Sequence, residues 1–362
     1  MAGASSPNLA PMSRRTATMA LTAVLLVALV ALAWLVPVPY VAMSPGPTEN
    51  TLGKVRGKPV ITIEGHRTYP TKGQLDLTTV AVTSPDQKLD LAGMVAGWLD
   101  PRVAVIPRDY VYPPNQTAEQ VQQQNAEQME TSQQAAVAAA LRQTGDKVTS
   151  VVQVKAVVEK SPAVGRLKAA DVILAVDGTK VTSAQQVVAL VGRHQPGDKL
   201  LFSVRRGGKP REVTITTTKS PTDAKRAFVG IQPFDGFQFP FAVRINLGQD
   251  IGGPSAGTMF ALAIVDKLTT GQLTGGRHVA GTGTIDADGK VGPIGGIQQK
   301  IAGAKEGGAT TFLVPAANCP AAAGASTKDI RLVRIASLRD AVSALKTLNK
   351  NPKATVPSCG RG

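Results

Sequence analysis

Ser255 and Lys300 are the side chains of this sequence whose types and surroundings best support chemistry. Ser255 lies in the segment GGPSAG (252–257), and Lys300 ends the segment PIGGIQQK (293–300). A serine hydroxyl becomes a strong nucleophile only when a neighbouring group takes its proton. A lysine can take that proton only while its amine is neutral, which requires burial to lower its pKa from about 10.4 toward about 7–8. The pair therefore predicts acyl-transfer chemistry of the kind that peptidases use.

The residues around Lys300 favour its burial. Ile297, Lys300, Ile301 and Ala304 are spaced at i, i+3, i+4 and i+7, so they share one face of a helix, while Lys305 lies off that face. A lysine that points inward is costly when charged and suits a base when neutral. The alternative is a snorkelling lysine, whose stem packs while its ammonium reaches water.

The Gly-Gly-Pro segment before Ser255 predicts a tight turn. Residues 255–268 that follow predict a buried helix with Ser255 in its first turn. Free backbone N–H groups and the positive end of the helix dipole lie at that position and could stabilise an oxyanion. The alternative is that Ser255 is a plain helix cap, for which serine is a preferred residue.

Several segments taken together resemble the proteolytic domain of Lon-type serine proteases. They are GPSAG (253–257), TGTI (282–285), PIGGI (293–297) with Lys300, GGA (307–309) and FLVP (312–315). The resemblance covers residues 228–348. It implies that Ser255 is the nucleophile and Lys300 the general base of a Ser-Lys dyad, with Thr282 as the hydrogen-bond partner that orients the lysine. Gly252 stands where many Lon domains carry an acidic residue.

Other catalytic arrangements lack support in the sequence. Nothing local places His66, His194 or His278 beside a serine elbow. There is no His-Glu-x-x-His or Cys-x-x-Cys motif, so we expect no metal. The Gly-x-x-x-x-Gly-Lys-Ser/Thr loop of ATPases is also absent, so we expect no cofactor and no need for ATP.

The composition is typical of a chain with hydrophobic cores, and its net charge suggests a negatively charged partner. The 362 residues allow two or three domains, and 43% hydrophobic but only 4% aromatic residues predict aliphatic cores. The net charge of +15 suggests acidic lipid headgroups, an anionic cell surface or nucleic acid nearby. Because no basic-aromatic recognition module is visible, we do not expect nucleic acid as a partner.

Residues 17–36 are uncharged and predict a transmembrane anchor in contact with lipid. At about 1.5 Å per residue they span the roughly 30 Å of hydrocarbon in a bilayer. Trp34 and Tyr40 mark one interface, and Arg14 and Arg15 mark the cytoplasmic side.

We therefore expect a cytoplasmic tail (1–16), a single pass through the cell membrane and an extracytoplasmic catalytic domain. The alternative is a cleaved signal peptide, against which the long apolar region and the lack of a convincing Ala-x-Ala site before residues 37–39 argue.

Residues 45–145 form the predicted N-terminal part of the ectodomain. Residues 45–113 have β-strand composition, and the Gln- and Ala-rich residues 116–143 predict a helix or, alternatively, a flexible connector. The resemblance to Lon-type proteases implies that this part completes the proteolytic domain and that the region that follows is an insertion.

Residues 146–220 resemble a bacterial PDZ domain. A Ser-Pro-Ala turn (161–163) precedes a strand within 171–178, and residues 187–191 and 213–215 predict the groove helix and a closing strand. PDZ domains bind an extended peptide by adding it to a sheet edge. No Gly-Leu-Gly-Phe-like loop stands before Val151. The alternative role is a lid or spacer.

The two cysteines, Cys319 and Cys359, lie beyond the predicted anchor, where disulfides are permitted. We expect a bridge that ties a flexible tail (349–362) to the Lon-like domain, and the alternative is two free thiols.

These observations predict an α/β (α+β) Lon-type proteolytic domain with a mixed sheet, an inserted or preceding β-rich PDZ domain and one transmembrane helix. The resemblance to PDZ-containing Lon-like membrane proteins implies an ATP-independent serine endopeptidase that hydrolyses unfolded or membrane-associated polypeptides, and by analogy a hexamer. The alternative is a catalytically silent scaffold that binds peptides at the membrane through its PDZ domain.

Overall fold

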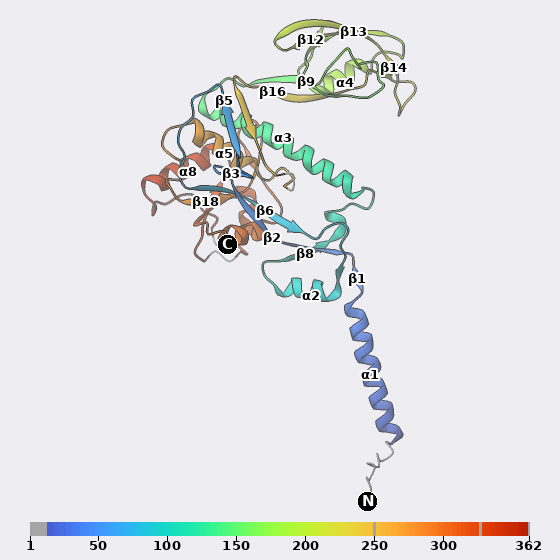
Figure 1. The fold of residues 1–362 in the computed structure, drawn as a ribbon, viewed down its shortest axis with the longest axis vertical. Helices are drawn as coiled ribbons and strands as arrows, with labels where there is room; N and C mark the ends of the chain where they lie inside the picture. The colour runs from blue at the N-terminus through green and yellow to red at the C-terminus, as the bar shows by residue number, and fades with distance from the viewer. Residues whose placement is uncertain (1–12, 249–250, 326–327, 361–362) are drawn as a thin grey trace, which may run out of the picture.

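The computed structural model describes residues 13–248, 251–325 and 328–360. Helix α1 (Arg14–Trp34) projects away from the rest of the chain with its side chains exposed (Figure 1). It is long and apolar enough to cross a membrane. The helix starts three residues before the predicted span because the Ser13 hydroxyl accepts a hydrogen bond from the Thr16 N–H. It ends shortly before Pro37, which disfavours helical backbone at the preceding residue.

The main sheet is mixed, as predicted, and combines two distant parts of the chain. Its strand order is β22-β21-β18-β6-β2-β8. These strands are β2 (Tyr40–Asn50), β6 (Gln74–Val82), β8 (Ala104–Pro107), β18 (His278–Gly281), β21 (Thr311–Pro315) and β22 (Arg331–Ile335). Strand β18 runs parallel to both β6 and β21, and β2 is antiparallel to β6 and β8. Residues before the PDZ-like region therefore complete the sheet of the proteolytic domain.

Helices cover both faces of this sheet. One face packs on α3 (Ala118–Thr144), α5 (Gly257–Leu268) and α8 (Leu338–Lys350), and the other packs on α6 (Ile297–Glu306) and α7 (Cys319–Ala322). Alternation along β21 accounts for the two cores, since Leu313 belongs to the first and Phe312 and Val314 to the second. All five residues of β21 are buried, as expected of a parallel strand covered on both faces.

The second unit is a β-rich domain at the end of the molecule farthest from α1 (Figure 1). Its sheet has the order β13-β12-β10-β9-β16. The strands are β9 (Thr149–Val157), β10 (Val172–Val176), β12 (Lys199–Arg206), β13 (Lys209–Thr216) and β16 (Ile231–Gln238), and its helix is α4 (Ala184–Val191). Strand β16 pairs with β9 along its length, so the domain extends beyond the predicted boundary at residue 220.

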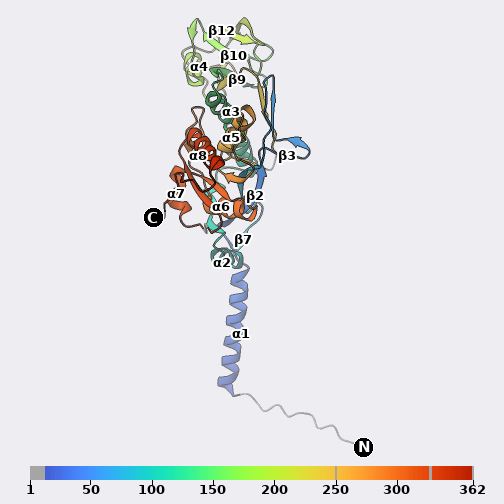
Figure 2. The ribbon, with the colours of Figure 1, turned by 90° about the vertical axis from the view of Figure 1, so that its left-hand side faces the viewer.

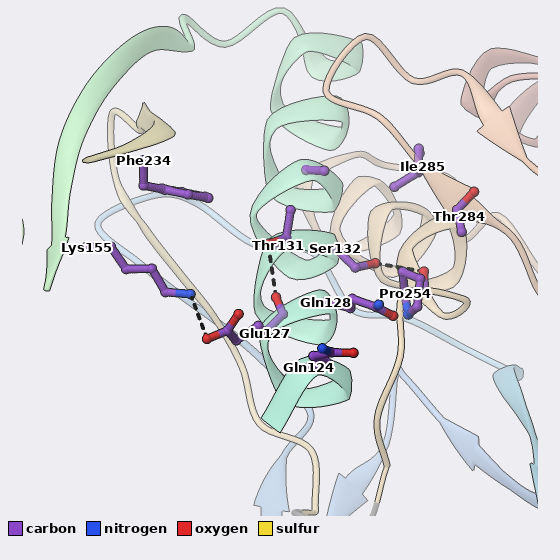
Figure 3. A pocket seen from close by; sticks show the side chains of 11 residues that line it. Gln124, Glu127, Gln128, Thr131, Ser132, Lys155, Phe234, Pro254, Thr284 and Ile285 are labelled. Atoms are coloured by element: carbon purple, nitrogen blue, oxygen red, sulfur yellow. Dashed lines mark hydrogen bonds and ion pairs between the residues drawn. The ribbon is translucent and has the colours of Figure 1, made fainter. Parts of the chain in front are cut away.

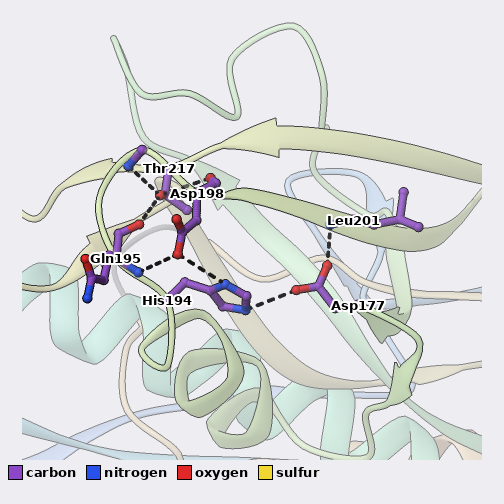
Figure 4. A network of polar contacts seen from close by, with 7 residues as sticks. Asp177, His194, Gln195, Asp198, Leu201 and Thr217 are labelled. Carbon is purple, nitrogen blue, oxygen red and sulfur yellow. Dashed lines mark hydrogen bonds and ion pairs between the residues drawn. The ribbon is translucent and has the colours of Figure 1, made fainter.

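His194 ties two loops of this second unit together (Figure 4). Its Nε2 lies 3.0 Å from Asp177 Oδ2, and its Nδ1 lies 3.6 Å from Asp198 Oδ2. Asp198 also accepts a hydrogen bond from the Gln195 N–H, and Asp177 accepts one from the Leu201 N–H. These contacts hold the two loops of the domain together.

Two parts of the chain differ from the sequence-based expectation. Residues 91–99, within a region predicted to be β-rich, form the helix α2 (Leu91–Leu99), which Asp90 caps. Helix α8 continues through Lys350, so the first two residues of the predicted tail are helical. Beyond them, Arg331 donates to the carbonyl of Pro352 and the Arg334 N–H donates to that of Pro357.

Short elements complete the fold. They are β1 (Pro37–Val38), β3 (Lys54–Val55), β4 (Lys58–Pro59), β5 (Ile61–Glu64), β7 (Leu89–Asp90), β11 (Thr179–Lys180), β14 (Thr218–Lys219), β15 (Ala227–Phe228), β17 (Ala242–Ile245), β19 (Thr284–Ile285) and β20 (Val291–Gly292), with 3-10 turns at Arg108–Tyr110 and Ala316–Asn318.

Candidate active site

Lys300 points into the protein from α6. The helix starts after Gly296, whose φ of 67° lies in the left-handed region. A Cβ at this position would lie 2.8 Å from Val80 Cγ1 and 2.9 Å from Met43 Sδ, so glycine lets the helix start approach β6 and β2 closely. The apolar face predicted for α6 is buried as a whole, and Lys300 on it is only 2% exposed. The lysine therefore does not snorkel to water.

Ser255 lies in the turn that leads into α5. The helix begins at Gly257 with Ala256 as its N-cap, so Ser255 precedes the first turn in which the sequence placed it. No side-chain hydrogen bond caps α5. The alternative of a plain serine cap is therefore wrong in this structure, and the hydroxyl is available for another partner.

Three predicted side chains meet at this point. Lys300 Nζ lies 2.7 Å from Ser255 Oγ and 3.1 Å from Thr282 Oγ1. Thr282 in turn donates its hydroxyl hydrogen to the carbonyl of Ser255 over 3.0 Å. Thr282 is fully buried and follows β18 directly. The sheet, the turn before α5 and the helix α6 thus each supply one member of the cluster.

Burial makes the amine of Lys300 easier to deprotonate. It lowers the Lys300 pKa from 10.5 to about 8, because the charged form loses hydration inside the protein. Among the described residues, the hydrogen-bond partners of the Lys300 amine are two neutral hydroxyls, which do not stabilise a positive charge as a carboxylate would. A fraction of the lysine is therefore neutral near pH 7, as a base for a serine hydroxyl requires.

A cavity of about 300 Å³ opens onto Ser255 and Lys300. Residues 78–81 of β6 form one of its walls, and Met129 of α3 and Gly252 line it elsewhere. The pairing of β6 with β18 ends at Leu77. Within the described residues, the part of β6 that faces the cavity therefore has a strand partner on its β2 side only.

Helix α3 holds the turn that carries Ser255. Ser132 donates a hydrogen bond of 2.9 Å to the carbonyl of Pro254, and the Gly253 N–H donates one of 3.0 Å to the carbonyl of Asn125. The two helices also approach closely, since a Cβ at Gly257 would lie 2.6 Å from Ser132 Oγ. Sequence reasoning missed these contacts, although Asn125 and Ser132 are seven residues apart and so share a helix face.

A second cavity, of about 480 Å³, lies between α3 and the β-rich domain (Figure 3). Lys155 of β9 and Phe234 of β16 line it on one side, and Pro254 lines it on the other. Lys155 Nζ lies 3.7 Å from Glu127 and 3.9 Å from Glu130 on α3. The helix therefore contacts both the Ser255 turn and the second domain.

A third cavity, of about 230 Å³, forms an apolar groove between α4 and the start of β16. Val187 and Val191 of α4 line it opposite the segment FVGI (228–231). Gly230 in this segment has a φ of 82°. This segment lies beyond the predicted domain boundary at residue 220, and its last residue begins β16. Among the described parts of the chain, β16 pairs with β9 on one side only, so it is an edge strand.

The remaining predicted residues lie elsewhere. His66 stacks on Phe241, and His278 Nε2 lies 2.8 Å from Asp76 Oδ2. Among the described residues, none of the three histidines contacts Ser255. Cys319 and Cys359 form a disulfide that joins the chain end to α7, with their Cα atoms 5.1 Å apart.

Comparisons with known proteins agree with this architecture. The model of the Lon protease (S16) C-terminal proteolytic domain matches residues 248–335, and the PDZ domain model matches residues 127–217. The chain is 46% identical to a Lon protease of Roseiflexus castenholzii over 68 residues, which is 19% of this chain and 8% of that protein. It is 33% identical to Lon protease 1 of Bacillus subtilis over 123 residues, which is 33% of this chain and 15% of that protein. The chain thus spans only a small part of the length of these relatives.

A solved PDZ domain of an SdrC-like protein from Listeria monocytogenes matches with 25% identity and a TM-score of 0.21, covering 23% of this chain and 86% of that one. The fold and the matched segments define a protein with a Lon-type (S16) proteolytic domain, a domain that implies a serine peptidase. In the same chain, a PDZ domain precedes the matched Lon segment, and one apolar helix lies near the N-terminus. This confirms the predicted family resemblance and fold class.

Proposed function

We propose that this chain is an ATP-independent, membrane-anchored serine endopeptidase in which Ser255 and Lys300 form the catalytic dyad. The observation that carries the proposal is the 2.7 Å contact between Lys300 Nζ and Ser255 Oγ, in which the lysine is only 2% exposed. A lysine whose pKa burial lowers to about 8 suits the role of general base.

In the proposed reaction, neutral Lys300 takes the proton of the Ser255 hydroxyl as Oγ attacks the scissile carbonyl. The resulting lysinium gives that proton to the leaving amine, and an acyl-enzyme ester remains on Ser255. Lys300, neutral again, activates a water molecule that hydrolyses the ester. Thr282 holds the amine in line, because its hydroxyl accepts from Lys300 while it donates to the Ser255 carbonyl.

Backbone N–H groups at the start of α5 would stabilise the oxyanion. Those of Ser255 and Ala256 have no hydrogen-bond acceptor among the described residues. They lie at the N-terminal end of a buried helix, where the helix dipole favours negative charge.

The free side of β6 would position the substrate. A polypeptide in extended conformation could add as a strand along residues 78–81, beyond the point where β18 ends, and reach Ser255 in the same cavity. This requirement for an extended chain favours unfolded or loosely structured polypeptide segments as substrates.

Helix α1 would anchor the enzyme in the cell membrane with the catalytic domain outside the cytoplasm. Its exposed apolar surface supports this role, and Arg14 and Arg15 at its start favour a cytoplasmic N-terminus. Assembly into a ring of six copies stays a prediction from the family resemblance.

The second candidate function is a peptide-binding scaffold without activity, which the groove between α4 and the edge strand β16 favours. The full chain, Ser255→Ala and Lys300→Ala, each purified in detergent, would be compared for casein cleavage. The proposal predicts cleavage by the unaltered chain only. Equal residual cleavage by all three proteins would contradict it, and absence of cleavage by all three together with peptide binding would favour the scaffold.

A further inference from the structure

Helix α2 presents an apolar surface to its surroundings. Its sequence, LAGMVAGWL, contains no charged residue, and Trp98 and Leu99 are 61% and 80% exposed. The other side of the helix packs on the domain, because Met94 and Gly97 are buried and a Cβ at Gly97 would lie 2.8 Å from Val105 Cγ2. The face of α2 that carries Met94 and Gly97 thus packs on β8, whereas the large apolar side chains of Trp98 and Leu99 remain exposed.

A short pair of strands fixes α2 next to the end of α1. Strand β1 follows α1, and β7 directly precedes α2. The two strands pair antiparallel, with Pro37 opposite Asp90 and Val38 opposite Leu89. The Asp90 carboxylate then caps α2 by accepting the Gly93 N–H over 2.6 Å. Figures 1 and 2 both show α2 at the end of the folded part that is nearest to α1.

The apolar surface of α1 continues to the level of α2. Trp34, the last residue of α1, and Leu35 and Val36 after it are 45%, 75% and 52% exposed. A bilayer that surrounds α1 would have its outer interface near Trp34, since tryptophan prefers the boundary between hydrocarbon and headgroups. Trp98 and Leu99 would then lie near the same boundary.

Charged residues flank α2 and do not interrupt it. Lys88 precedes it and is exposed, and after it Arg102 pairs with Asp100 over 2.8 Å. Tryptophan is enriched at the membrane–water interface, so an exposed tryptophan and leucine with charged residues on either side suit a position at that interface.

We propose that α2 lies in the lipid–water interface of the membrane that α1 spans and forms a second contact with phospholipid. This inference rests on the proposed anchoring by α1. Because α2 also packs on β2 and β8, its contact with lipid sets how the sheet that carries the Ser255 cavity is oriented to the bilayer. In this proposal the phospholipid surface covers the exposed face of α2. The alternative, which the test must distinguish, is that a second copy of the chain covers this face.

The chain offers a direct test because it contains two tryptophans, Trp34 and Trp98. Full-length Trp34→Phe, in which Trp98 is the only tryptophan, is reconstituted in phosphatidylcholine vesicles with or without bromine on the acyl chains. The proposal predicts that brominated lipid quenches Trp98, more strongly when bromine is near the headgroup than near the chain end. Equal fluorescence in plain and brominated vesicles would overturn it.

Full-length Trp98→Phe reports on Trp34 and so tests the anchor by itself. Quenching of Trp34 without quenching of Trp98 rejects the role of α2 and leaves the anchor intact, whereas a lack of both rejects the anchor and α2 together. If Trp98 fluorescence follows the protein-to-lipid ratio and not bromine, a second copy covers α2 and the proposal is wrong. Far-UV circular dichroism checks that each variant is folded, and Trp34→Tyr replaces Trp34→Phe if that variant is not.

Discussion

Ser132 on α3 donates a 2.9 Å hydrogen bond to the carbonyl of Pro254, the residue directly before Ser255. The same helix leads into β9 of the PDZ domain and carries the carboxylates that lie near Lys155. A single helix therefore connects the PDZ domain with the turn of the proposed nucleophile.

Ser132→Ala should reduce kcat/KM for a peptide substrate. The loss of one neutral hydrogen bond is worth about 1 kcal/mol, or about fivefold in rate when the turn must be held for reaction. Thr131→Ala on the exposed side of the same helix is the matched control and should leave kcat/KM unchanged. Equal effects of the two substitutions in steady-state assays would speak against a positioning role for Ser132.

The activity should rise with pH below about 8. The amine of Lys300 acts as a base only without its proton, and burial lowers its pKa to about 8. Well below that value, kcat/KM should therefore increase about tenfold per pH unit and then level off above it. A pH profile of kcat/KM checks this expectation, and a rise that continues to about 10.4, the usual lysine value, would exclude a lysine buried as described.

Lys300→Met should abolish cleavage and yet stabilise the fold at pH 7. Lowering the pKa from 10.5 to about 8 corresponds to a destabilisation of about 3 kcal/mol by the buried charge. Between these two pH values the unfolded chain binds the proton that the folded chain has lost, so the stability of the unaltered protein rises with pH. The advantage of the variant in urea unfolding should consequently shrink from pH 8 toward pH 10.5. An advantage that is independent of pH would contradict this origin.

Thr282→Val should lower kcat by a larger factor than it changes KM. The substitution keeps the size of the side chain but removes the hydroxyl between Lys300 and the Ser255 carbonyl. Loss of a buried hydrogen-bond partner, worth about 1–3 kcal/mol, predicts a decrease of roughly 5- to 150-fold. Thr282→Ser retains the hydroxyl and should restore most of the activity, whereas equal loss in both variants would indicate a purely structural role.

The structure brings Ser255, Lys300 and Thr282 within hydrogen-bonding distance, whereas the catalytic roles that the sequence suggests for them stay predictions. The spacing of apolar residues in α6 is local information, and it places Lys300 on the buried face. The start of α5 was placed two residues too early, because helix ends depend on local capping that the sequence of the turn does not reveal. Fold class followed from the combined segments, since several short motifs in a fixed order rarely occur together by chance.

Features that depend on distant contacts could not be predicted. Residues 91–99 form a short apolar run without clear alternation, and such a run does not distinguish a helix from a strand. The segment 228–231 lines the groove beside α4 only because β16 pairs with β9, which lies much earlier in the chain. The contact between Ser132 and Pro254 likewise arises from tertiary packing of α3 on α5.

The central claim is that Ser255, activated by Lys300, forms a covalent bond with the substrate carbonyl. The most direct test is to treat the full chain at pH 9 with a serine-reactive fluorophosphonate and to locate the adduct by tandem mass spectrometry. The account predicts an adduct on Ser255 in the unaltered protein and little or none in Lys300→Ala. Substrate cleavage by a protein whose Ser255 stays unlabelled, or equal labelling of Ser255 in both proteins, would contradict it.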